Sequence, residues 1–317
     1  MGITKWLAAA LCSGSLALVS LQSNEASVEV NTKEELGEKL FSDPILSRGR
    51  AISCASCHIP QFAFADTAAF SFGDKGTRLT RNSPALTNLS GRTDFFWDGR
   101  AGSLEEQVLG PLSAHDEMDL PVDQAVERLK KDDFYSAAFQ KVFKSEVNNK
   151  NLLSAIAAFE RTLETTDTPY DRYLDGDEKA LSAAAVRGRM LFIGKANCAT
   201  CHSGEDFTAD RFKSIGLFNG RELNDPGRFK ITEDSSHIGL FKVPGLRNVA
   251  VTAPYMHNAM FKTLREVVQY YNTPDKFVQN PINRDLSLGS ALNLSDSEVD
   301  DIVAFLEALT DDRFKQK

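Results

Sequence analysis

Residues 52–60 read ISCASCHIP and residues 197–204 read NCATCHSG, so the chain spells Cys-x-x-Cys-His twice. Three kinds of site use paired cysteines at this spacing: a redox dithiol, a zinc site and the attachment site of haem c. The histidine that follows each pair favours haem, because two thiols can bond to the porphyrin while the adjacent imidazole binds the iron. The pattern therefore predicts two covalently bound haem-c groups.

The two alternatives account less well for the histidines. A zinc site built from four thiolates would not require a histidine beside each cysteine pair. A thioredoxin-like dithiol lies in a βαβ unit, which this sequence does not predict. The predicted attachment residues are Cys54, Cys57, Cys198 and Cys201, with His58 and His202 as proximal iron ligands.

The N-terminus is typical of an exported protein. Lys5 precedes an apolar run from Trp6 to about Leu21, after which the chain becomes polar. A membrane anchor is the alternative, but the run is short for a span of ~20 residues. We expect residues 1–26 to be a signal peptide that takes Cys12 with it, and the mature chain to be periplasmic without a membrane span.

The charge of the chain bears on its partners. Its 44 acidic and 36 basic residues give a net charge of −8. This balance offers no electrostatic basis for binding nucleic acid, and it suits a cationic partner instead.

The sequence also contains an internal duplication. GEKLF at residues 37–41 precedes the first haem motif, and GRMLF at residues 188–192 precedes the second. FWDGRAGSLEEQV at residues 96–108 aligns without gaps to MHNAMFKTLREVV at residues 256–268. We therefore predict an N-terminal haem domain over residues 27–174 and a related C-terminal haem domain over residues 175–317.

Apolar periodicity predicts that the domains are helical. The expected helices cover residues 32–41, 125–132, 152–165, 181–192, 263–271 and 294–309. Ser295 and Glu298 are spaced as a helix-capping pair, and residues 168–182 have the Pro, Gly and charge of a connector. Strand patterns are scarce. The expected fold is mainly α, with two tandem cytochrome c-like haem domains and long loops.

Five further segments resemble the bacterial di-haem cytochrome c peroxidase and MauG superfamily. They are RNSPALTN (81–88), FWDGRAGSLEEQVLGP (96–111), EM (117–118), TPYDRYLDGD (168–177) and LRNVAVTAPYMH (246–257), and the likeness runs from about Glu35 to Leu309. The resemblance implies that the haem on His58 is the peroxidatic one, with Glu117 and Gln107 in its distal pocket. It also implies that Trp97 carries electrons between the haems. A carboxylate at Glu117 would move a proton between the two peroxide oxygens.

The same resemblance implies a calcium ion between the haems. Its ligands would be Asn82 and the backbone carbonyls of Thr252 and Pro254, and hard oxygen donors of this kind suit calcium. Asn82 alone, without the resemblance, is equally consistent with a residue that caps a turn.

One loop departs from the pattern of the peroxidases. Many family members carry there a histidine that blocks the peroxidatic iron, whereas this chain reads SFGDKG at residues 71–76 and places Asp74 at that position. We therefore expect the iron on His58 to be open in the oxidised protein. His115 is an alternative blocking ligand, since it lies two residues from Glu117.

A second departure concerns the C-terminal haem. Fourteen residues after His257, where peroxidases carry a distal methionine, this chain has Tyr271, as the MauG-like branch does. A tyrosinate stabilises oxidised iron better than a thioether does. Tyr270, Met256 and Met260 are the competing ligands, and packing of the aromatic side chains on a neighbouring helix is the alternative role.

Three functions follow from these expectations. The first is a periplasmic di-haem peroxidase that reduces hydrogen peroxide with electrons passed through the C-terminal haem from a small cytochrome c or cupredoxin. The second is a MauG-like enzyme whose peroxide-derived high-valent haems oxidise Trp or Tyr of a partner protein. The third is a non-enzymatic di-haem electron carrier, which would gain nothing from an open site.

Overall fold

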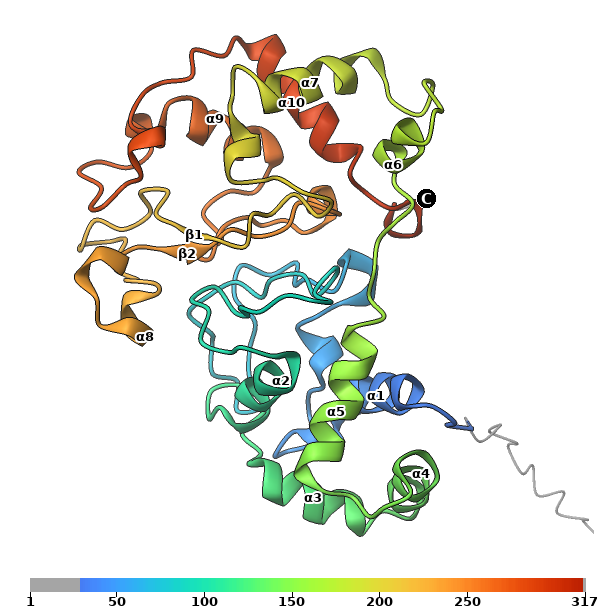
Figure 1. The fold of residues 1–317 in the computed structure, drawn as a ribbon. Coiled ribbons are helices and arrows are strands. Elements are labelled where there is room, and N and C mark those ends of the chain that lie inside the picture. The colour runs from blue at the N-terminus through green and yellow to red at the C-terminus, as the bar shows by residue number, and fades with distance from the viewer. Residues whose placement is uncertain (1–28, 316–317) are drawn as a thin grey trace, which may run out of the picture.

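The computed structural model describes residues 29–315. The predicted signal peptide, with Cys12, lies outside the described residues. Figure 1 shows two mainly helical halves, one above the other, joined by an extended segment between helices α5 and α6. The prediction of a mainly α fold is therefore confirmed. None of the helices in the described range is long and apolar enough to cross a membrane.

The N-terminal half packs helix α1 against helix α5. Its helices are α1 (Lys33–Ser42), α2 (Leu104–Ser113), α3 (Val122–Lys130), α4 (Asp133–Phe143) and α5 (Asn149–Glu160). A side chain at Gly37 on α1 would overlap the backbone carbonyl of Ala155 on α5, so only glycine lets the two helices approach this closely. Helices α2 and α4 were not among the predicted helices.

The C-terminal half repeats this arrangement with helices α7 and α10. Its helices are α6 (Pro169–Leu174), α7 (Ala183–Ile193), α8 (Phe229–Thr232), α9 (Leu264–Asn272) and α10 (Asp296–Glu307). A side chain at Gly188 on α7 would overlap the carbonyl of Asp301 on α10. Ser295 and Glu298 form the predicted capping box at the start of α10.

The aligned loop segments also share a backbone conformation. Phe95 pairs with Ala101 in one half, and Tyr255 pairs with Phe261 in the other, each as an isolated antiparallel bridge. The next residue has a positive φ in both cases, 64° at Phe96 and 73° at Met256. The gapless alignment of these segments therefore identifies structurally equivalent positions, which agrees with the predicted duplication.

Two predictions about the middle of the chain were wrong. Helix α5 ends at Glu160 rather than Thr165. Beyond it the backbone bonds to the N-terminal half instead, because the Asn88 N–H donates to the Leu163 carbonyl at 2.9 Å. The expected connector contains the short helix α6, which Pro169 at its first position and a capping box between Thr168 and Asp171 allow to form.

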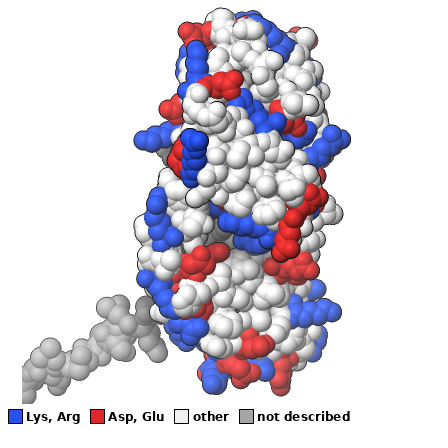
Figure 2. All heavy atoms as spheres, turned by 90° about the vertical axis from the view of Figure 1, so that its left-hand side faces the viewer, with Lys and Arg blue, Asp and Glu red and all other residues white. Residues whose placement is uncertain are grey.

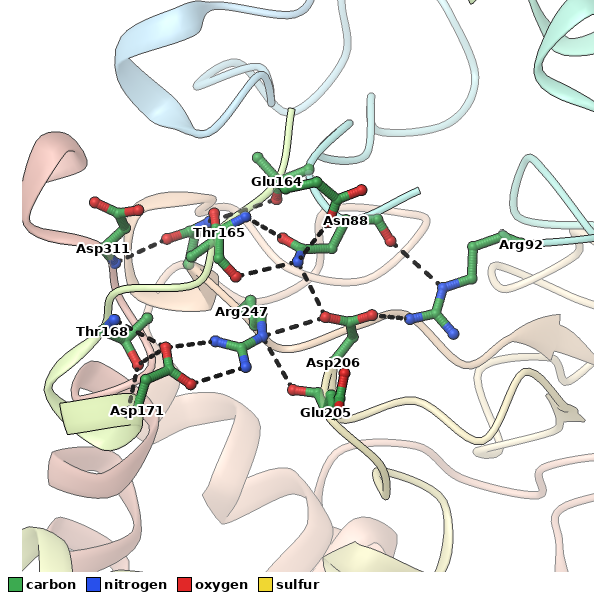
Figure 3. Close-up of polar contacts among 12 residues, drawn as sticks. Asn88, Arg92, Glu164, Thr165, Thr168, Asp171, Glu205, Asp206, Arg247 and Asp311 are labelled. Atoms are coloured by element: carbon green, nitrogen blue, oxygen red, sulfur yellow. Dashed lines mark hydrogen bonds and ion pairs between the residues drawn. The ribbon is translucent and has the colours of Figure 1, made fainter. Parts of the chain in front are cut away.

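A network of polar side chains joins the two halves (Figure 3). The Asn88 amide donates to Asp206 at 3.0 Å and to Glu164 at 3.1 Å. Arg92 contacts Asp206 as well, and Arg247 donates to both oxygens of Asp171 at 2.8 and 2.9 Å. Asn88 and Arg92 thus join the N-terminal half to Asp206 of the C-terminal half, and the bidentate pair of Arg247 and Asp171 orients α6 within the C-terminal half.

The described residues contain one small sheet, which also lies between the halves. Its strands β1 (Phe212–Lys213) and β2 (Phe241–Lys242) are antiparallel. The Lys242 N–H donates to the carbonyl of Trp97 at 2.8 Å, so the sheet is attached to the N-terminal half at the proposed electron-transfer residue.

The surface shows no concentration of one charge on the face that Figure 2 presents. Acidic and basic side chains are interspersed there, with uncharged surface between them. This pattern agrees with the modest net charge of −8.

Candidate functional site

Each Cys-x-x-Cys-His motif folds as one tight turn. The turns are the 3₁₀ helices Cys54–Ser56 and Cys198–Thr200. In each motif the histidine N–H donates to the carbonyl of the first cysteine at 2.9 Å, from His58 to Cys54 and from His202 to Cys198. The two motifs thus present cysteines and imidazole in the same local geometry.

The two imidazoles are also oriented in the same way. Nδ1 of His58 lies 3.0 Å from the Phe64 carbonyl, and Nδ1 of His202 lies 3.0 Å from the Phe207 carbonyl. A carbonyl only accepts, so Nδ1 carries the hydrogen in both rings and Nε2 keeps its lone pair for a metal. Burial lowers the pKa of both histidines, which favours the neutral form that binds iron.

The zinc and dithiol alternatives find no support in the described residues. These contain no group of three or more His, Cys, Asp or Glu side chains close enough to hold a metal ion. The cysteines within this range are all free. The donor sets instead fit two haem-c groups, each with two thiols and one correctly oriented imidazole.

A largely apolar cavity lies beside the first motif. Cys54, Cys57 and His58 line it, together with apolar side chains such as Phe41 and Ile156. The cavity therefore fits a haem tethered at the motif, and the haem iron would supply the redox chemistry there.

The structure places Glu117 and Gln107 in the lining of the same cavity. Burial raises the pKa of Glu117, and the nearby Asp116 carboxylate adds to this effect. Gln107 is 8% exposed, and its Oε1 has no hydrogen-bond partner among the described residues. A buried amide oxygen without a partner is costly, so a bound molecule that donates a hydrogen bond would stabilise it.

Asp74 does not line the cavity. Its Oδ2 accepts from the Gly49 N–H at 2.8 Å, and its own N–H donates to the Glu117 carbonyl at 2.8 Å. His115 is exposed and its Nδ1 lies 2.9 Å from Asp119, so it also stays outside the lining residues. Neither side chain is placed to block an iron held by His58.

Trp97 lies at the boundary between the halves. Its indole N–H donates to the Asn82 carbonyl at 2.8 Å. On the other side, its ring meets that of His257 edge to face, and His257 stacks on Phe241 with ring centroids 3.7 Å apart. The side chain therefore contacts both halves.

Asn82 bonds to the segment that contains the other two residues implied for calcium. The Asn82 N–H donates to the His257 carbonyl at 2.8 Å, which holds Asn82 beside the segment that carries Thr252 and Pro254. The Asn82 amide nitrogen donates to the carbonyls of Ala68 and Ala69 at 3.2 and 3.3 Å. This leaves its Oδ1 as the amide atom available to a cation.

The two tyrosines at the end of α9 have different surroundings. Tyr270 is 1% exposed, and its hydroxyl donates to the Ile215 carbonyl. Tyr271 packs against the same hydrophobic core as Cys198 of the second motif. Burial raises the pKa of Tyr271, and the nearby Tyr270, Cys198 and Cys201 add to the shift. The structure therefore directs Tyr271, and not Tyr270, toward the second haem motif.

The four methionines of the described residues are dispersed. Met190 is 64% exposed on α7, and Met260 is 36% exposed. Met118 is buried in the core of the N-terminal half and lines the first cavity. Met256 packs beside the core of the C-terminal half.

Two features of the site were not predicted from the sequence. Glu160 lines the first cavity from the end of α5. Its spacing of four and eight residues from Ile156 and Leu152 was the available signal, since these positions share one helix face. Arg81 donates to Asp225 at 2.6 and 2.9 Å and to Asp98 at 2.6 Å. The half-buried pair of Arg81 and Asp225 joins the two halves, and only the fold brings these residues together.

Two protein-family models match successive parts of the chain. Residues 31–179 match the family described as di-haem cytochrome c peroxidase, and residues 185–310 match cytochrome c.

Curated relatives of the chain include both MauG proteins and cytochrome c peroxidases. The chain is 39% identical over 285 residues to the methylamine utilization protein MauG of Methylorubrum extorquens, covering 87% of this chain and 78% of that protein. It is 35% identical over 286 residues to the cytochrome c551 peroxidase of Pseudomonas aeruginosa, covering 88% and 78%. Peroxidase and MauG relatives are thus similar to this chain at comparable identity.

Solved structures of both kinds, MauG-like and peroxidase, also match the chain. A MauG-like protein associated with microbial copper homeostasis matches with a TM-score of 0.79 and 31% identity, over 89% of this chain and 92% of that one. The di-haem peroxidase BthA of Burkholderia thailandensis matches with a TM-score of 0.79 and 28% identity, over 89% and 86%.

Proposed function

Because the chain belongs to the di-haem cytochrome c peroxidase and MauG family of oxidoreductases, we propose that it reduces hydrogen peroxide at the haem held by His58. Electrons would arrive through the haem held by His202, from a small cytochrome c or cupredoxin in the periplasm. The observation that carries this proposal is the cavity beside His58, whose largely apolar lining includes the polar side chains of Glu117 and Gln107.

Glu117 has the chemistry to move the protons of the reaction. Reduction of one hydrogen peroxide to two water molecules consumes two electrons and two protons. The electrons would come from the donor protein through the haems. The Glu117 carboxylate can take the proton from one peroxide oxygen and return it to the other, so that the leaving oxygen departs as water. Burial raises its pKa, which makes it a stronger base than an exposed glutamate.

Gln107 would orient the peroxide. Its Oε1 lacks a partner in the described residues and can accept a hydrogen bond from a peroxide hydroxyl, while its amide hydrogens remain available as donors. Binding of peroxide would thus give the buried Gln107 Oε1 the hydrogen bond that it lacks among the described residues.

The site should accept peroxide without a preceding conformational change. Asp74 is bonded to Gly49 and Glu117, away from the cavity, and His115 is bonded to Asp119. We therefore expect the iron on His58 to keep an open position in the oxidised protein.

Trp97 would connect the two haems. Its hydrogen bond to Asn82 and its contact with His257 place one aromatic side chain against both halves. Calcium bound by Asn82 and the carbonyls of Thr252 and Pro254 would stabilise the same boundary.

A MauG-like activity is the second candidate, and the position of Tyr271 favours it. An anionic oxygen ligand from Tyr271 would stabilise the oxidised C-terminal haem, and oxidising equivalents would then be used on a Trp or Tyr of a partner protein. A di-haem electron carrier has less support, because it would not require Glu117 and Gln107 in the cavity.

A single assay separates these functions. Hydrogen peroxide is added to the oxidised holoprotein in the presence of a reduced small cytochrome c. The peroxidase predicts that the donor is oxidised catalytically. The MauG-like enzyme predicts an oxidised protein that persists until a protein substrate is added, and the absence of any reaction with peroxide would contradict both.

A further inference from the structure

Glu160 is a buried acid that the proposed mechanism does not use. It is the last residue of α5 and is 3% exposed. Ile156, one turn earlier on the same helix, lines the first cavity with it, as do Cys54 and His58. The carboxyl group therefore faces the space into which the first haem fits, from a helix whose other cavity-facing residue is apolar.

The carboxyl group has no compensating partner. Its Oε2 is buried and lacks a hydrogen-bond partner among the described residues. The adjacent cation, Arg161, points elsewhere and donates to both oxygens of Glu105 on α2 at 2.9 Å. A buried carboxylate without a partner is strongly disfavoured, and burial raises the pKa of Glu160 to about 8.

Few charged groups in the described residues face Glu160. Arg161 favours its carboxylate form and Glu105 opposes it, and these two also neutralise each other. Glu117 lies across the cavity lining, and Cys54 becomes an uncharged thioether once haem is attached. Helices α1 and α3 turn buried apolar residues such as Leu40 and Leu129 toward this core. The bound haem would therefore be the main charge that changes near Glu160.

We propose that Glu160 exchanges a proton with solvent as the N-terminal haem changes oxidation state, taking up one proton when that haem gains one electron and releasing it when the haem is oxidised. This inference rests on the haem attachment at Cys54, Cys57 and His58 in the proposed function, but it does not depend on whether the enzyme acts as a peroxidase or like MauG.

The coupling follows from charge. Ferric haem carries one more positive charge than ferrous haem, and in a weakly polar interior that charge favours a nearby carboxylate. Addition of one electron from a one-electron donor removes the charge, and the carboxylate then binds one proton to give the neutral acid. Net charge in the cavity is unchanged, so the buried site avoids an uncompensated charge in both oxidation states.

The test is a potentiometric titration of the holoprotein without peroxide, followed in the absorption bands of the N-terminal haem at a series of pH values. Between the pKa of Glu160 beside the oxidised haem and its higher pKa beside the reduced haem, the potential should fall as pH rises, by as much as about 59 mV for each tenfold fall in proton concentration. In Glu160→Gln, which keeps the shape of the side chain, the potential should become independent of pH over this range.

Two control variants locate the effect. Glu105→Gln breaks the pair with Arg161 beside Glu160, and Glu117→Gln removes the other cavity acid. Both should keep the slope. A slope that is lost in Glu117→Gln and kept in Glu160→Gln would overturn the proposal in favour of Glu117.

A second measurement covers the case in which Glu160→Gln fails to bind haem. The reduced-minus-oxidised infrared difference spectrum of the wild-type holoprotein should show a carbonyl band of a protonated carboxylic acid appearing on reduction, and Glu160→Asp should shift it. A potential that does not vary with pH in the wild-type protein, or a spectrum without such a band, would contradict the proposal. Neither outcome bears on peroxide turnover, so failure here leaves the proposed function intact.

Discussion

Trp97 and His257 meet edge to face between the two halves of the molecule, with ring centroids 6.3 Å apart. They occupy equivalent positions of the internal duplication, one residue after Phe96 and Met256. Asn82 joins them, because its carbonyl accepts from the Trp97 indole and its N–H donates to the His257 carbonyl, both at 2.8 Å. The duplicated loops thus face each other and place an aromatic pair at the boundary between the two halves.

Trp97→Phe should slow electron transfer from the C-terminal to the N-terminal haem. The substitution keeps a ring but removes the hydrogen bond to Asn82 and part of the contact with His257. Stopped-flow reduction of the oxidised holoprotein measures the step as the delay between the two haems. Phe96→Leu is the matched control in the adjacent position, and equal rates in the wild type and Trp97→Phe would exclude Trp97 from the path.

Glu117→Gln should lower the rate of peroxide reduction by about 10²–10⁴-fold while leaving both haems bound. The amide cannot take the proton from peroxide. In the wild type the rate should rise with pH through a pKa above 4.5, since the carboxylate is the active form and burial raises its pKa. Glu127→Gln, the same change at an exposed glutamate of α3, is the control, and an unchanged rate in Glu117→Gln would remove Glu117 from the mechanism.

Asp119→Asn should destabilise the segment that carries Glu117. Asp119 contacts Lys75 at 2.7 Å, Arg48 at 2.6 Å and His115 at 2.9 Å, and the Lys75 and Arg48 cations hold its pKa well below the usual range. A lowered folded-state pKa adds stability above the unfolded pKa of about 3.9, and this is lost as the pH falls through the folded-state pKa. Thermal unfolding against pH measures the effect.

In Asp119→Asn this acid-dependent loss of stability should be smaller than in the wild type. Asp123→Asn, which removes an exposed carboxylate bonded to Asn149, should leave it unchanged. The same pH dependence in all three proteins would show that the Asp119 contacts do not stabilise the fold.

Tyr271→Phe should raise the reduction potential of the C-terminal haem and change its oxidised spectrum. The hydroxyl proposed to bind iron is lost, and an anionic oxygen stabilises the ferric state. Tyr270→Phe is the matched control: it loses the hydrogen bond to the Ile215 carbonyl, which should cost about 1 kcal/mol of stability without altering the haem. Equal potentials in the wild type and Tyr271→Phe would refute ligation.

The sequence predicted the parts of this structure that depend on local pattern. The two haem motifs, the helices that contain Gly37 and Gly188, and the cap at Ser295 depend on residues that are near one another in the chain. The duplicated segments were recognised because residues 96–108 and 256–268 share their spacing.

Features that depend on distant residues were not predicted. Helix α5 ends at Glu160 because its continuation bonds to Asn88, and no local signal marks that contact. Asp74 is bonded to Gly49, twenty-five residues earlier, and Arg81 to Asp225, farther still. Such pairs arise from packing between segments, which the apolar periodicity of each segment does not encode.

The proposed function depends most on an open coordination position at the iron held by His58. The electron paramagnetic resonance spectrum of the oxidised holoprotein as isolated tests for this open position directly. We predict a high-spin ferric signal from the N-terminal haem, present without any prior reduction, beside a low-spin signal from the C-terminal haem. Two low-spin signals and no high-spin component would show that a second protein ligand occupies the iron at His58, and would contradict the account.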